Sequence, residues 1–252
     1  MPDSRYDLIL KNGTAVLPEG THQTDIAIKG SKIAAIGNFG DNATEIVDCK
    51  SLHILPGVID TQVHFREPGA THKEDLEHGM MAAVMGGVTG IFEMPNTTPL
   101  TVTPEALQDK LDRASKGAWC DYAFYFGGTA QNAENLAEWE NLPGVCGIKI
   151  FMGSSTGDLL SATDEEVLAV LSNGKRVVAA HAEDEMMMIE NKKTILGDST
   201  DVAMHNIWRS KESCLSATKR LVTLARKAGR RVHVLHITSA EEMEFLSQNK
   251  DI

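Results

Sequence analysis

The chain has 252 residues, of which 42% are hydrophobic, and it carries a formal net charge of -11. A chain of this length and composition can bury a large core, which excludes an intrinsically disordered protein. The acidic balance argues against nucleic acid as the main partner, and no apolar run reaches the roughly 18 residues of a membrane span. The four cysteines are widely spread and form no C-x-x-C motif, so we expect reduced thiols in a cytoplasmic protein.

The first 55 residues are rich in short strands. The sequence predicts strands over residues 6–11, 14–17, 24–29, 32–36 and 45–48. Asn12-Gly13 and Lys29-Gly30-Ser31 are typical hairpin turns between them. We therefore predict a small β-sandwich segment over residues 1–55. Pro56-Gly57 marks a boundary, and a second domain is expected over residues 56–252.

From residue 58 onward, short apolar strands alternate with helical stretches. Strands are predicted over residues 58–64, 88–94, 120–127, 145–152, 176–181 and 231–237. Helix start signals lie between them: Thr103-Pro104, Thr163 with Glu166, and Ser239 with Glu242. Apolar strands that alternate with helices predict an α/β fold, a parallel sheet covered by helices. Polar residues at several strand ends favour a (β/α)8 TIM-type barrel over the alternative, a doubly wound open sheet.

The number of strands is smaller than this barrel requires. About six strand–helix units follow residue 57, whereas a closed barrel of this type needs about eight. Six strands would leave two long unpaired edges, a liability for a soluble protein. We therefore expect these residues to be the N-terminal part of a longer polypeptide.

Polar side chains follow one another along the strand that opens the second domain. Alternation places Asp60, Gln62 and His64 on one face. A polar row inside an apolar strand is costly unless something binds it, and a metal ion at the end of the strand would do so. Arg66 lies just beyond, where the strand opens into a loop, and is well placed to bind an anionic substrate.

Lys149 lies inside the apolar strand predicted over residues 145–152. A lysine in such a place must be paired, deprotonated or modified. The more common case is a pairing with a carboxylate elsewhere in the chain. The other interpretation is that the neutral amine of Lys149 captures carbon dioxide, because the resulting carbamate is anionic and can bridge two metal ions.

Two histidines end predicted strands in equivalent positions, His181 after Val177 to Ala180 and His236 after Val232 to Leu235. A lone histidine there is more often a hydrogen-bonded core residue. Together with His64 at a third strand end, however, the pair favours a metal site. Asn96 follows the second barrel strand. It is either a turn former or, above the barrel mouth, a group that binds substrate.

These residues together resemble the dihydroorotases of the amidohydrolase superfamily, specifically the longer-chain type related to hydantoinases and allantoinases. The resemblance runs over nearly the whole chain. The F-R-E-P-G and M-P-N-T motifs are the most specific part of it. The matching segments are residues 64–69, 73–75, 86–89, 94–97, 147–149, 180–183 and 236–239.

The resemblance implies a zinc-dependent hydrolase with a distorted barrel and a small β-sandwich assembled from both ends of the chain. One or two zinc ions are expected. His64 would bind one metal ion, a CO2-derived carbamate on Lys149 would bridge two, and His181 and His236 would hold the second. The metals would lower the pKa of a bound water and polarise the attacked carbonyl.

The resemblance also implies a substrate. Arg66 and Asn96 would bind the substrate carboxylate in the reversible interconversion of N-carbamoyl-L-aspartate and L-dihydroorotate, a step of pyrimidine biosynthesis. A homodimer is expected, with aspartate transcarbamoylase as a further possible partner.

This chain departs from the family pattern in two ways. The family's D-x-H-x-H reads Asp60-Thr61-Gln62-Val63-His64 here, and a glutamine oxygen is a poorer zinc ligand than imidazole. We therefore expect a weak metal site at His64 or a single firmly held ion. The family's catalytic aspartate belongs to an eighth strand, so the general base is not named, and these 252 residues alone are expected to turn over little.

Two further hypotheses stay open. One is a related cyclic amidase, such as an allantoinase or a dihydropyrimidinase, from which Arg66 and Asn96 distinguish a dihydroorotase. The other is a non-catalytic dihydroorotase-like partner of aspartate transcarbamoylase. Gln62 is the kind of change that such a loss of function would bring, whereas the retained Lys149 and His181 argue against it.

Overall fold

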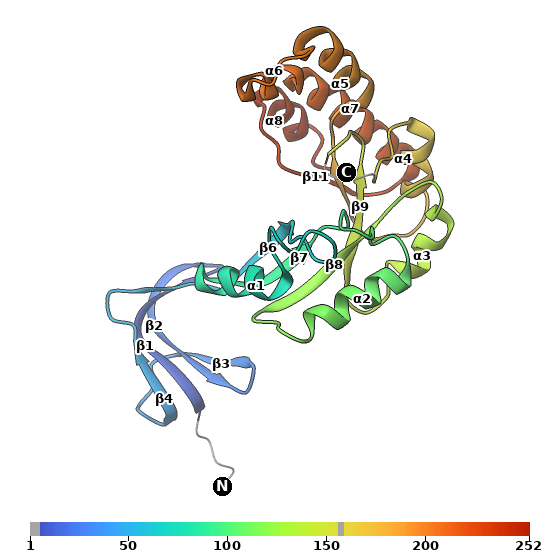
Figure 1. Ribbon diagram of the computed structural model, residues 1–252. Coiled ribbons are helices and arrows are strands. Elements are labelled where there is room, and N and C mark those ends of the chain that lie inside the picture. The colour runs from blue at the N-terminus through green and yellow to red at the C-terminus, as the bar shows by residue number, and fades with distance from the viewer. Residues whose placement is uncertain (1–5, 156–158) are drawn as a thin grey trace. The chain divides into compact units, whose positions relative to one another are not determined.

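The computed structural model describes residues 6–155 and 159–252 (Figure 1). The chain divides into two compact units, Met1–Val58 and Ile59–Ile252. Among the helices of the described residues, none is long and apolar enough to cross a membrane.

The first unit is a β-sheet with the strand order β3-β2-β1-β4, in which β5 also pairs with β1. The pairs β1–β2 and β2–β3 are antiparallel, whereas β4 and β5 run parallel to β1. A small apolar cluster of Ile9, Ala27 and Ala43 is buried on it. The strands are β1 (Tyr6–Leu17), β2 (Gly20–Lys29), β3 (Lys32–Gly37), β4 (Ala43–Asp48) and β5 (His53–Ile54).

One expectation for this unit was wrong. Asn12-Gly13 is not a hairpin turn, because β1 continues through it with a register irregularity between Leu10 and Gly13. Asn12 takes the left-handed conformation (φ 62°), and its backbone N–H donates to Oδ1 of the buried Asp25. The described residues of this unit form one sheet, and the β-sandwich, which was expected to be assembled from both ends of the chain, stays a prediction. The predicted turn at Lys29-Gly30 is confirmed, since β2 and β3 pair across it.

The second unit contains a six-stranded sheet whose spatial order, β11-β10-β9-β8-β7-β6, follows the chain. The pairs from β7 to β11 are parallel, which confirms the predicted α/β class. In the described part of the chain the sheet stays open, so the closed eight-stranded barrel is not formed by these residues. The strands are β6 (Val58–Val63), β7 (Val88–Glu93), β8 (Asp121–Gly127), β9 (Val145–Phe151), β10 (Val178–His181) and β11 (Val232–Val234).

Three helices begin where the sequence predicts, at Thr103, Thr163 and Ser239. Thr103 and Ser239 each accept a hydrogen bond from the backbone three residues on, and Thr163 with Glu166 forms a complete capping box. The helices are α1 (Leu76–Met85), α2 (Pro104–Ala114), α3 (Leu136–Trp139), α4 (Asp164–Leu171), α5 (Glu185–Asn191), α6 (His205–Trp208), α7 (Lys211–Ala228) and α8 (Ala240–Ser247). Short 3-10 turns lie at Ala133–Asn135 and Val202–Met204, and a π-helical turn at Lys192–Leu196.

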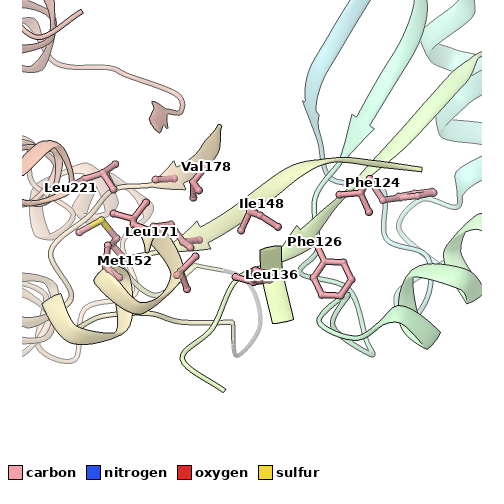
Figure 2. Packing of buried hydrophobic residues seen from close by; sticks show 14 of the residues in the cluster. Phe124, Phe126, Leu136, Ile148, Met152, Leu171, Val178 and Leu221 are labelled. Atoms are coloured by element: carbon pink, nitrogen blue, oxygen red, sulfur yellow. The ribbon is translucent and has the colours of Figure 1, made fainter. Parts of the chain in front are cut away.

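The main core lies between the sheet and its helices. Figure 2 shows strand residues such as Phe126 and Ile148 beside Leu136 and Leu171, which come from α3 and α4. Ile148 and Ile150 both belong to this core and are fully buried. Side chains alternate along a strand, so Lys149 between them points to the opposite face of the sheet. Because Ile148 and Ile150 pack against the helices, Lys149 lies on the face of the sheet that the helices of this core do not cover.

A buried ion pair connects the segments that precede β9, β10 and β11. Arg230 and Glu140 are each about 3% exposed, and Nη2 of Arg230 donates to Oε2 of Glu140 at 2.7 Å. The same guanidinium donates to the backbone oxygens of Arg176 and Asn173, both at 2.6 Å. The other carboxylate oxygen accepts from the backbone N–H of Lys175. One pair thus satisfies the polar groups of three chain segments.

We expect the substitution Arg230→Met to lower the free energy of unfolding by about 3–5 kcal/mol, because it leaves the Glu140 carboxylate buried without its cation. The measurement is urea unfolding followed by circular dichroism. Arg226→Met is the matched control, since Arg226 pairs with Asp251 on the exposed surface, and it should cause no measurable change. Equal stability of the two variants would contradict the role given to Arg230.

Candidate active site

Four of the side chains singled out in the sequence lie at or just beyond the carboxyl ends of sheet strands. Lys149 is in β9, His181 ends β10, and His236 and His64 follow β11 and β6 closely. Burial and then the charge of Arg66 lower the pKa of His64 to about 4, with further contributions from Lys149 and His181. Although His236 as a residue is exposed to solvent, desolvation of its ring by the packed surroundings, together with His181 and Lys149, lowers its pKa to about 4 as well. The charges of these groups therefore act on one another, and the direct contact among them is that between His181 and His236.

The two histidines on neighbouring strands face each other directly. Nδ1 of His181 lies 3.0 Å from Nε2 of His236, and the ring centroids are 4.8 Å apart. Two nitrogens that bind one tetrahedral zinc ion at about 2.0–2.1 Å lie about 3.3 Å from each other. The pair has the spacing of joint ligands. His236 takes the left-handed backbone conformation (φ 42°), which costs energy for a residue other than glycine.

The amine of Lys149 is buried without a partner. The residue is 1% exposed, and its Nζ makes no hydrogen bond among the described residues. Its nearest polarisable neighbour is the ring of Phe151, whose centroid lies 4.3 Å away. Burial therefore lowers the pKa of Lys149 well below its usual range. The described residues do not offer the carboxylate that the paired interpretation of this lysine requires.

His64 is oriented by Asn96. Nδ1 of His64 lies 2.9 Å from Oδ1 of the buried Asn96. An amide oxygen only accepts, so Nδ1 carries the proton and Nε2 keeps its lone pair. The backbone before Asn96 is fixed in turn, since Lys110 donates to the oxygen of Met94 and pairs with the buried Glu93. Sequence reasoning missed this contact, although both residues follow adjacent strands.

The remaining predicted residues, apart from Asn96, lie on β6 or in the segment that follows it. Gln62 is half-buried on β6, whereas Asp60 before it is exposed and accepts from the Gln62 backbone N–H. Arg66 is half-buried, and its backbone N–H donates to the oxygen of Glu74. Among the described residues, no carboxylate forms an ion pair with its guanidinium. The charge of Arg66 acts on both His64 and the buried carboxyl group of Glu93, so a cation lies beside the site.

The residues fit a metal ion only under one condition. The described part of the chain has no group of three or more His, Cys, Asp and Glu side chains that could hold one. The facing histidines supply two ligands, and the next donor at hand is Lys149. A protonated amine is no ligand, whereas the buried and unpartnered Nζ is suited to conversion into a carbamate. With that modification the donor set suits zinc.

A cleft of about 660 Å³ opens beside the two histidines. Glu183 and Arg209 line it and were not singled out from the sequence, although Glu183 follows His181 at the strand end. Burial acts to raise the pKa of Glu183, but contacts with His181 and Arg209 outweigh it and lower the pKa to about 2. The cleft is also lined by Ser155, His205, Asn206 and Thr238.

Comparison with known proteins gives a consistent picture. A family model described as "Dihydro-orotase-like" matches residues 52–242. An allantoinase from Bacillus velezensis is 33% identical over 97% of this chain and 55% of its own length. An allantoinase from Salmonella choleraesuis is 34% identical over 96% of this chain and 56% of its own length. The chain thus spans about half the length of these curated relatives.

Solved structures agree in fold. The L-hydantoinase (dihydropyrimidinase) from Arthrobacter aurescens superposes with a TM-score of 0.90 at 28% identity, over 98% of this chain and 56% of that one. A dihydropyrimidinase from Brevibacillus agri gives a TM-score of 0.86 at 29% identity, over 96% and 54%. The six-stranded parallel sheet thus matches part of the barrel domain in those enzymes. From its matching family model and its relatives, the chain belongs to the dihydroorotase-like family of cyclic amidohydrolases.

Proposed function

We propose that this protein acts as a metal-dependent cyclic amidohydrolase, with zinc held by His181, His236 and a carbamate on Lys149. The observation that carries the proposal is the buried, unpartnered amine of Lys149 beside two histidines whose nitrogens lie 3.0 Å apart. His64 would hold a second ion through Nε2. Gln62 stands where a further imidazole is expected, so this second ion would be held weakly.

The chain's own residues would divide the work. Bound zinc lowers the pKa of a water ligand towards neutrality and polarises a carbonyl oxygen. Asn96 fixes the tautomer of His64 by accepting from Nδ1, which keeps Nε2 free to bind. The low pKa values of His64 and His236 keep both rings neutral near pH 7, as ligands must be. Arg66 would neutralise and orient an anionic group of the substrate.

The guanidinium of Arg66 favours a substrate that carries a carboxylate. We therefore propose the interconversion of N-carbamoyl-L-aspartate and L-dihydroorotate as the reaction. The second candidate is the opening of allantoin, which the names of the relatives at 33% and 34% identity favour. Allantoin carries no carboxylate, so it would leave Arg66 without a counterion.

A non-catalytic role remains the third candidate. A dihydroorotase-like partner of aspartate transcarbamoylase would not need to bind metal. Retention of Lys149 and of the facing histidines argues for a working site, whereas Gln62 argues for a weakened one. A homodimer, like an association with a transcarbamoylase, is a proposal that co-purification and light scattering test.

We predict that Lys149 carries a carbamate in the presence of zinc and bicarbonate. Protein exchanged into 13C-bicarbonate should give one carbamate carbon signal in the NMR spectrum, and Lys149→Gln should abolish it. Lys110 supplies the control, because it is equally buried but pairs with Glu93, so Lys110→Met should keep the signal. A signal that survives Lys149→Gln would contradict the proposal.

We predict that Arg66→Met weakens binding of N-carbamoyl-L-aspartate about 10- to 100-fold, the contribution of a hydrogen bond to a charged group. Binding of the neutral ring dihydrouracil should not change. Isothermal titration of the zinc-loaded protein measures both, and ring-opening assays with dihydroorotate and allantoin run beside it. Turnover of allantoin with no binding of carbamoyl aspartate would establish the second candidate instead.

We predict that the metal-free protein loses stability as the pH falls from about 6.5 towards 4. The folded-state pKa values of His64 and His236 are about 4, against the usual 6.5. In this window the unfolded chain binds more protons than the folded one, so the free energy of unfolding falls with pH and is fully restored above about pH 6.5. Urea unfolding across this range measures it. His64→Gln should flatten the profile, whereas His233→Asn, an exposed position on β11, should not.

A further inference from the structure

We infer that Glu183 and Arg209 are positioning residues of the metal site: the Glu183 carboxylate holds the imidazole of His181, and Arg209 holds the carboxylate. The inference rests on the proposed function in so far as His181 binds metal. It assigns a role to two residues of the cleft wall that the proposed reaction does not itself use.

The contact with His181 is close and shielded. Nε2 of His181 lies 2.6 Å from Oε2 of Glu183, and both side chains are about 10% exposed. The oxygen lies off the direction of the ring N–H, so the contact is electrostatic rather than a well-aligned hydrogen bond.

The two nitrogens of the His181 ring therefore have different neighbours. Nδ1 faces Nε2 of His236, and Nε2 faces a carboxylate. A carboxylate favours a proton on the nitrogen that it contacts, which leaves the lone pair of Nδ1 directed at the shared ligand position. Glu183 lies on the opposite side of the ring from His236. It is thus placed to orient a ligand and not to act as one.

Arg209 fixes the carboxylate from a distant segment. Its Nε donates to Oε1 of Glu183 at 3.1 Å, and its Nη2 pairs with Oε2. The same Nη2 donates to the backbone oxygen of Ser154 at 2.9 Å. Such a two-point grip holds a carboxylate in one orientation. Arg209 follows α6, so the segment around α6 is tied directly to the metal site.

The Ser154 contact extends this arrangement to the strand that carries Lys149. Ser154 follows β9, and its backbone N–H and Oγ both donate to Glu185 at 2.5 Å. At Gly153, an added Cβ would lie 2.6 Å from the backbone oxygen of Glu183. The loops after β9 and β10 approach so closely that only glycine fits there. Arg209 thus connects the loops that follow two of the proposed ligands.

The test compares the wild-type protein with Glu183→Ala, Glu183→Gln, Arg209→Met and the control Arg220→Met. Arg220 also bridges neighbouring carboxylates, Asp164 and Asp184, but does not contact His181. The first measurement is the zinc dissociation constant, from competition with a chromophoric chelator. The second is the tautomer of His181 in the metal-free protein, read from 15N shifts of its ring. Circular dichroism checks that each variant is folded.

We expect Glu183→Ala to weaken zinc binding about 10- to 100-fold, the usual effect of losing a group that orients a metal ligand. Glu183→Gln keeps an acceptor and should fall between this variant and the wild type, and Arg209→Met should act in the same direction. Arg220→Met should bind zinc as the wild type does. The Nε2-protonated tautomer of His181 should dominate in the wild type and lose its excess in Glu183→Ala.

The outcomes separate the two proposals. Wild-type zinc affinity and an unchanged tautomer in folded Glu183→Ala and Arg209→Met would overturn the positioning role. If the wild-type protein binds no zinc, the proposed function fails, and the tautomer measurement alone decides whether Glu183 orients His181.

Discussion

The site depends on one constraint: the amine of Lys149 cannot remain a free cation where the fold puts it. Ile148 and Ile150 are locked into the core beneath the helices, so the side chain between them must lie on the other face of the sheet. There it is 1% exposed and has no carboxylate among the described residues. An unpaired buried ammonium ion costs several kcal/mol, so the group becomes neutral, and a neutral amine is a nucleophile. The packing of the helix layer thus places the amine of Lys149 where burial lowers its pKa and favours the neutral form.

The orientation of the proposed ligands comes from groups outside the ligand set. The strand ends bring His64 and His181 near the lysine, but a strand does not fix the rotation of an imidazole ring. Asn96 accepts from one nitrogen of His64, and Glu183 contacts one nitrogen of His181. In each case the nitrogen that faces away from the partner is left for a metal. The same physical device thus acts at two separate strand ends, once with an amide and once with a carboxylate.

The strands of the second unit and three helix starts could be predicted from short stretches of sequence. All six strands of the second unit and the caps at Thr103, Thr163 and Ser239 could be predicted from apolar runs and hydroxyl residues. The hairpin expected at Asn12-Gly13 failed because the left-handed conformation of Asn12 serves an irregularity within β1. The backbone N–H of Asn12 donates to Asp25, which lies on another strand. A turn prediction that uses only neighbouring residues does not take this contact into account.

The candidate site shows the same division. Residues at strand ends could be selected one by one, because position along a strand is a local property. The contacts of Glu183 with Arg209 and of His64 with Asn96 join residues 26 and 32 positions apart. Separations of this size follow no helix or strand period, so the sequence alone does not predict these contacts. The open edges of the sheet were expected from the number of strands alone, whereas the single-layer arrangement of the first unit depends on pairings that strand prediction does not supply.

The charge of Arg66 is the feature of the site that bears on the proposed substrate. The arginines near the site differ in their partners: Arg209 is held by Glu183, and Arg113 by Glu67 and Asp109. Arg66 has no such carboxylate in the described part of the chain, although it is half-buried and its charge is felt by His64. Glu93, the carboxyl group on which its charge acts, is paired with Lys110, so a further anion would stabilise the half-buried guanidinium. A substrate carboxylate would supply that anion at the moment of binding, whereas a neutral cyclic amide would leave the cation as it is. The position of Arg66 beside His64 therefore supports the proposed carboxylate-bearing substrate.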